Sequence, residues 1–143
     1  MQTQQQKTLK QDSSPKQRLS VGEGVVAVLN LLIGAVAAWM AFDLLINVGH
    51  TPAFLLPGST AALGAFGAIF TGILIFLRQR RLAFATQWLG VAGALGLFVV
   101  TTWSMLKYTI DLRVFLITSL PLLIVALIFT WFAWFLKRIG ESE

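Results

Sequence analysis

The stretch TAALGAFGAIFTGILIFL-RQRR-LAFATQWLGVAGALG, residues 60–96, decides the fold of this chain. It consists of two apolar runs joined by the cluster Arg78-Gln79-Arg80-Arg81. With their flanking residues, both runs are long enough to form helices that cross a hydrocarbon core of about 30 Å. The cluster between them is typical of a cytoplasmic turn, because Lys and Arg concentrate on that side of a membrane. The stretch therefore predicts a membrane hairpin.

Composition places the rest of the chain in the same environment. Of 143 residues, 57% are hydrophobic and 12% are charged, whereas a soluble domain carries about a quarter charged residues. So much apolar surface is implausible for a small soluble domain, which has little interior. The net charge of +5 lies beside the apolar runs, so it is explained by membrane topology, and we expect no nucleic-acid partner.

Working outward from the hairpin, the apolar runs predict four spans in an all-α transmembrane bundle. The expected membrane domain covers residues 21–139, after a polar tail (1–20) that we expect to be disordered and before a short polar tail (140–143). The predicted spans are residues 22–47, 58–77, 82–106 and 114–136. Pro121 lies inside the fourth span and is a candidate kink.

The distribution of basic residues predicts the orientation of the bundle. Nine of the eleven Lys and Arg residues fall in the N-terminal tail, in the cluster or after the fourth span, and only Lys107 and Arg113 fall on the opposite side. The positive-inside rule then places both termini in the cytoplasm. We expect an integral, multi-pass protein of a bacterial inner membrane or an equivalent energy-conserving membrane.

Small side chains recur at four-residue intervals in the hairpin. They include Gly64, Ala68 and Gly72 in the second span, and Gly90 and Ala94 in the third. Strips of small residues let helix backbones approach closely in lipid, where association depends on packing. Because a very short turn makes the two helices neighbours, we expect these strips to meet. The alternative is that one strip faces another subunit.

Two polar residues of the first span are candidates for ion or proton handling. Asp43 lies near the end of the span among apolar neighbours, and a carboxylate drawn into lipid is costly and often functional. It could equally be a hydrated acid at the interface. Asn30 lies deeper, and we interpret it as part of a helix contact with an interhelical hydrogen bond. Glu23 opens the same helix, where the helix dipole favours an acid.

The remaining candidates lie in connections between spans. His50, in a loop broken by Gly and Pro, is a candidate pH sensor or pigment ligand, although a solvated His explains it as well. Arg78, Arg80 and Arg81 are candidate contacts for an anionic lipid or for an acidic partner, although topology already explains them.

The residues needed for catalysis are scarce. The chain has no Cys and one His, which removes thiolate chemistry and most metal-ligand sets, so we expect neither an enzyme nor a bound cofactor. The sequence favours an accessory or structural subunit that packs against other integral membrane proteins or a second copy, within membrane lipids. The alternative is a small oligomeric transporter or channel that uses Asp43 and Asn30.

Overall fold

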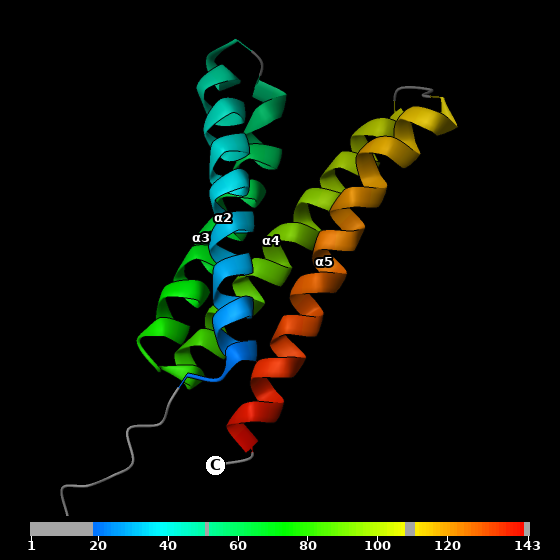
Figure 1. The fold of residues 1–143 in the computed structure, drawn as a ribbon. Coiled ribbons are helices and arrows are strands. Elements are labelled where there is room, and N and C mark those ends of the chain that lie inside the picture. The colour runs from blue at the N-terminus through cyan, green and yellow to red at the C-terminus, as the bar shows by residue number, and fades with distance from the viewer. Residues whose placement is uncertain (1–18, 51, 108–110, 142–143) are drawn as a thin grey trace, which may run out of the picture.

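The computed structural model describes residues 19–50, 52–107 and 111–141, and their main elements are four long helices (Figure 1). These are α2 (Val21–Ile46), α3 (Leu55–Phe76), α4 (Arg80–Lys107) and α5 (Leu112–Glu141), with two 3₁₀ turns, η1 (Asn47–Gly49) and η2 (Pro52–Phe54), between α2 and α3. All four helices have the length and apolar composition of membrane spans. The predicted all-α class with four long apolar helices is confirmed, and all four are candidate membrane spans.

α3, α4 and α5 are longer than the predicted spans, whereas α2 has the predicted length. α3 begins at Leu55, so Pro57 is its third residue, where a missing N–H breaks no helical hydrogen bond. α4 begins inside the basic cluster at Arg80, and α5 runs without interruption past Pro121. Residues 1–18 of the predicted tail lie outside the described residues, and Ser20 is the N-cap of α2.

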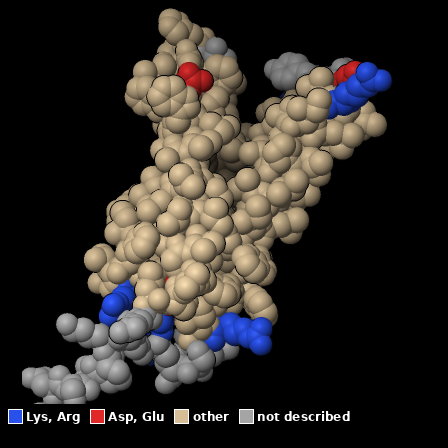
Figure 2. All heavy atoms as spheres, in the orientation of Figure 1, with Lys and Arg blue, Asp and Glu red and all other residues tan. Residues whose placement is uncertain are grey.

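Each helix packs against its neighbours in the sequence: α2 on α3, α3 on α4, and α4 on α5. The described chain begins and ends at the same end of the bundle as the turn between α3 and α4, and we call this the basic end because Lys and Arg gather there (Figure 2). At the opposite end, the open end, α2 and α3 diverge from α4 and α5 (Figure 1). The bundle is therefore closed at one end and split at the other.

Glycines bring α3 and α4 into backbone contact. A Cβ added at Gly93 would lie 2.2 Å from the backbone nitrogen of Gly64, and one added at Gly67 would lie 2.2 Å from that of Gly90. No L side chain fits at such distances, so Gly is required at both positions. We call these four glycines the α3–α4 seam. Ala94 is adjacent, since its backbone nitrogen lies 3.6 Å from a Cβ added at Gly64.

A second face of α3 packs against α2. A Cβ added at Gly72 would lie 2.9 Å from the carbonyl oxygen of Ala27 and 2.7 Å from the Leu31 side chain. Ala68 is shared, because a Cβ added at Gly34 would lie 3.2 Å from its Cβ, whereas one added at Gly90 would lie 3.6 Å from its backbone nitrogen. Of the predicted strip in α3, Gly64 thus faces α4, Gly72 faces α2, and Ala68 contacts both.

The turn between α3 and α4 has the hydrogen bonds of a Schellman motif. The Gln79 N–H donates to the Leu74 carbonyl (2.9 Å), and the Arg78 N–H donates to the Ile75 carbonyl (3.0 Å). Arg78 has a φ of 61°, the left-handed conformation that usually requires Gly at this position. The turn therefore reverses the chain within three residues and places Arg80 at the first turn of α4.

Candidate functional site

A buried ion pair joins α2 to α4 at the basic end. Arg80 donates from Nε to Glu23 Oε1 at 2.7 Å and from Nη2 to Glu23 Oε2 at 3.3 Å. Glu23 is only 1% exposed, and the Arg80 side chain is 19% exposed. Because the guanidinium presents two donors to two carboxylate oxygens, the pair fixes the orientation of both side chains.

Ser20 also forms hydrogen bonds with Glu23. Its backbone N–H donates to Glu23 Oε2 at 2.8 Å, and its Oγ accepts the Glu23 N–H at 3.2 Å, which together form a capping box. The Glu23 carboxylate thus accepts hydrogen bonds from the backbone at the start of α2 and from the Arg80 guanidinium. The sequence explains Glu23 through the helix dipole alone and marks Arg80 as a candidate contact for a lipid or an acidic partner, but it does not predict that the two residues pair. The available signal was that Glu23 and the basic cluster are predicted to lie on the same side of the membrane.

Asn30 lies deeper in α2 and is fully buried. Its Nδ2 donates to the Val26 carbonyl of its own helix at 3.0 Å, so the predicted interhelical hydrogen bond is wrong. Its Oδ1 has no hydrogen-bond partner among the described residues. The intrahelical bond forms because the Val26 carbonyl lies one turn back, within reach of the Asn30 amide without any help from another helix.

Gln87 is a second fully buried amide, and the sequence analysis did not single it out. Its Nε2 donates to the Phe129 carbonyl of α5 at 3.4 Å, while its Oε1 finds no partner within the described part of the chain. Between α3 and α4, the hydroxyls of Thr71 and Thr86 lie 2.9 Å apart. Polar side chains, rather than apolar ones alone, thus connect the helices in the basic half of the bundle.

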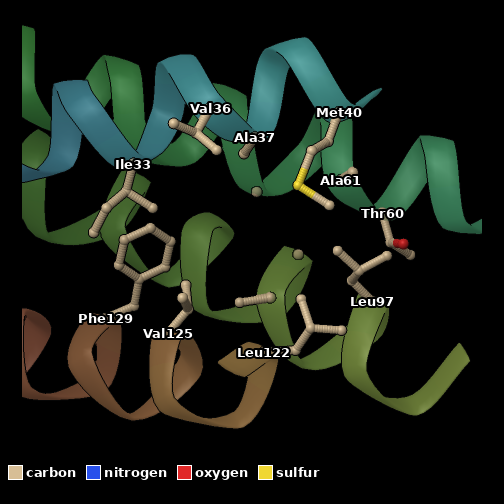
Figure 3. A pocket seen from close by; sticks show the side chains of 13 residues that line it. Ile33, Val36, Ala37, Met40, Thr60, Ala61, Leu97, Leu122, Val125 and Phe129 are labelled. Atoms are coloured by element: carbon tan, nitrogen blue, oxygen red, sulfur yellow. The ribbon is translucent and has the colours of Figure 1, made fainter. Parts of the chain in front are cut away.

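A cleft begins in the middle of the molecule, where α2 and α5 separate (Figure 3). Its inner hollow has a volume of about 110 Å³. The floor is the seam at Gly64 and Gly93; α2 supplies Ile33 and Met40, and α5 supplies Phe129. Thr60 is the single polar side chain among the described lining residues. The inner hollow therefore suits an apolar group.

The outer hollow follows at the open end, with a volume of about 530 Å³. It continues along the same helix faces: Leu44 lies one turn beyond Met40 in α2, and Val100 and Thr101 lie one turn beyond Leu97 in α4. Its lining is more polar, with Thr101, Ser104 and Lys107 on α4. The space-filling view shows the molecule hollowed between its two halves here (Figure 2). We call the two hollows together the cleft.

Asp43 and Asn30 are not brought together. Asp43 is exposed on α2 near the open end, and its backbone carbonyl accepts a hydrogen bond from Asn47 Nδ2 at 2.7 Å. Asn30 is buried in the other half of the helix, and neither residue lines the cleft. His50 is exposed at the end of η1. Arg78 and Arg81 are exposed at the basic end, while Arg80 is bound to Glu23.

Within residues 19–50, 52–107 and 111–141, no group of three His, Cys, Asp or Glu side chains is arranged to hold a metal ion. Comparison of the chain with models of protein families, with curated proteins and with solved structures finds no match. The fold and its polar contacts define a small multi-pass membrane protein, and two features stand out in it: the buried ion pair and the cleft.

Proposed function

We propose that the protein is a non-catalytic accessory subunit that binds another integral membrane protein through the outward face of α5. The observation that carries the proposal is the one-sided packing of this helix. α5 packs on α4, where Phe129 lies 3.3 Å from a Cβ added at Gly90, and Ala126, Phe132 and Ala133 of α5 are buried. Large apolar side chains cover its opposite side, among them Ile117, Leu127, Trp131 and Trp134.

Pro121 adds a backbone feature to the same helix. A proline cannot donate the N–H that a helix directs to the carbonyl four residues earlier, here that of Ile117. The Ile117 residue is 75% exposed, and in membrane-spanning helices the carbonyl released by a proline is satisfied by another donor, such as one from a neighbouring helix. A donor from a neighbouring protein would satisfy it. This supports α5 as the partner-binding element.

The proposal includes an orientation with both termini in the cytoplasm of a bacterial inner membrane or an equivalent membrane. It is supported by Arg78, Arg80, Arg81, Lys137 and Arg138, which belong to the basic end, whereas Lys107 and Arg113 belong to the open end. A transport path along Asp43 and Asn30 has less support, because one residue is on the surface and the other is buried.

The absence of Cys from the chain permits an unambiguous cross-linking test. Single-cysteine variants Ile117→Cys and Leu127→Cys carry the probe on the outward face of α5, and Val28→Cys carries it on an exposed position of α2. In native membranes, a photoactivated cross-linker on either α5 position should capture a different membrane protein, and the α2 position should not. Capture from all three positions alike, or of a second copy alone, would contradict the accessory role.

A further inference from the structure

The cleft changes character along its length. The inner hollow is lined almost entirely by apolar side chains, whereas the outer hollow contains the hydroxyls of Thr101 and Ser104 and the ammonium group of Lys107. Trp103 also lines the outer hollow, and Lys107 Nζ lies 5.7 Å from the centre of its ring. Tryptophan and a basic residue together at the end of a span are typical of the membrane–water interface.

A ligand that fits an apolar inner hollow and a polar, basic outer hollow has an apolar tail and an anionic head. The tail would extend toward the seam, where glycines leave room between α2 and α5, and Phe129 closes the inner end (Figure 3). The head would lie at the rim beside Lys107, which is the one charged side chain among the described residues that line either hollow. An ammonium group binds phosphate as a point charge.

We propose that the cleft binds one phospholipid molecule, with the end of an acyl chain in the inner hollow and the head-group phosphate at Lys107. The bilayer around the helices supplies this molecule at the correct depth, because the polar rim lies at the end of the spans and the apolar hollow lies toward their middle. The site uses the side of α5 that faces α2 and α4, so it does not depend on the proposed partner on the opposite side.

The structure offers a matched pair of variants that test the tail. Ala37 lines the inner hollow, and Ala35, two residues away on α2, is exposed outside it. Ala37→Phe fills the hollow and leaves the glycines of the seam in place, whereas Ala35→Phe adds the same volume to the outer surface. Purified protein would be stripped of lipid in mild detergent and titrated with dioleoyl-phosphatidylglycerol, and bound lipid would be counted by native mass spectrometry.

The wild-type protein and Ala35→Phe should each bind one phosphatidylglycerol molecule, and Ala37→Phe should lose it. Equal binding by both variants, or no stoichiometric binding by the wild type, would overturn the proposal. If Ala37→Phe instead changes the oligomeric state or releases a co-purifying protein while lipid binding persists, the occupant is a protein helix and the lipid proposal is wrong.

A second pair of variants tests the contact with the lipid head group. Both substitutions lie outside the core of the bundle, so this pair remains informative if Ala37→Phe fails to fold. Lys107→Gln removes the cation at the rim, and Arg113→Gln removes one from the same end outside the cleft. Lys107→Gln should weaken phosphatidylglycerol binding roughly fivefold, and Arg113→Gln should not. Dioleoylglycerol, which lacks the phosphate, should bind the wild type as weakly as phosphatidylglycerol binds Lys107→Gln. Equal affinity of the wild type for the two lipids would refute the phosphate contact.

Discussion

Glu23 is the residue whose burial most needs an explanation, because an ionised carboxylate loses its hydration inside the bundle. Arg80 and Ser20 replace that hydration with charged and neutral hydrogen bonds. Such a pair need not be more stable than a well-packed apolar pair, but removal of one partner leaves the other charge uncompensated. The pair therefore specifies which ends of α2 and α4 lie together.

Substitution of Glu23 tests this role. Glu23→Gln should lower the free energy of unfolding by about 2 kcal/mol, because it replaces the charged hydrogen bonds between Glu23 and the Arg80 guanidinium by neutral ones. Thermal denaturation in detergent would measure the loss, with Asp43→Asn, at an exposed acid of the same helix, as the control. Arg80→Gln should add little to Glu23→Gln in a double-mutant cycle. Fully additive effects would show that the two side chains do not act as a pair.

Arg78 holds a left-handed backbone conformation at a position usually taken by Gly. Arg78→Gly should stabilise the turn by about 1 kcal/mol relative to Arg78→Ala, because both remove the charge but only Ala keeps the Cβ that strains this conformation. Comparison of the two melting temperatures isolates that strain. If the Ala variant is as stable as the Gly variant, the φ of Arg78 costs nothing.

Sequence reasoning identified Asn30 as a buried contact residue but assigned its hydrogen bond to another helix. The error has a physical source, since an Asn side chain in a helix can reach its own backbone one turn back. Composition and spacing do not reveal whether Asn30 forms a hydrogen bond within its own helix or to another helix. Gln87 was missed for a related reason: the residue it contacts is a backbone carbonyl of α5, which no sequence pattern marks.

The α3–α4 hairpin is the element that the sequence described best. Its four-residue spacing of small side chains indicated a close helix contact, and the short turn indicated which helices would be neighbours. The spacing could not assign each small residue to a partner, because Gly64, Ala68 and Gly72 follow each other around the helix by about 40° per step. Only packing decides that Gly72 faces α2.

The seam predicts a sharp contrast between two Gly→Ala variants. Gly93→Ala forces a Cβ against the Gly64 backbone and should cost about 2–3 kcal/mol in unfolding free energy. Gly24→Ala, whose Cβ would lie 3.7 Å from the Leu19 side chain, should be neutral or stabilising. Chemical denaturation of the two variants measures the difference. A small cost at Gly93 would mean that α3 and α4 can separate there without loss.

The four described helices are apolar on nearly every outward face, and this limits what the sequence can say about function. Exposed side chains such as Val28, Leu32 and Leu127 have the same chemistry whether they meet lipid or a partner. In water, an apolar face would mark the interior. In a bilayer that contrast disappears, so the open cleft and the one-sided packing of α5 emerge only from the three-dimensional arrangement.

The orientation of the molecule can be tested without altering a charge. Gln79→Cys places a thiol at the basic end, and Leu112→Cys places one at the open end; both positions are exposed. A membrane-impermeant maleimide should label Leu112→Cys in intact cells and Gln79→Cys only in inverted vesicles. The reverse pattern would place the termini outside and contradict the distribution of basic residues.

The neighbour-to-neighbour packing of the helices also has a consequence for biosynthesis. Each helix finds its main packing partner in the segment that the ribosome has just completed, so assembly in the membrane can follow the order of translation. The ion pair can form only after Arg80 has been synthesised, 57 residues after Glu23. Formation of the pair therefore requires α2, α3 and the start of α4, but it does not require α5.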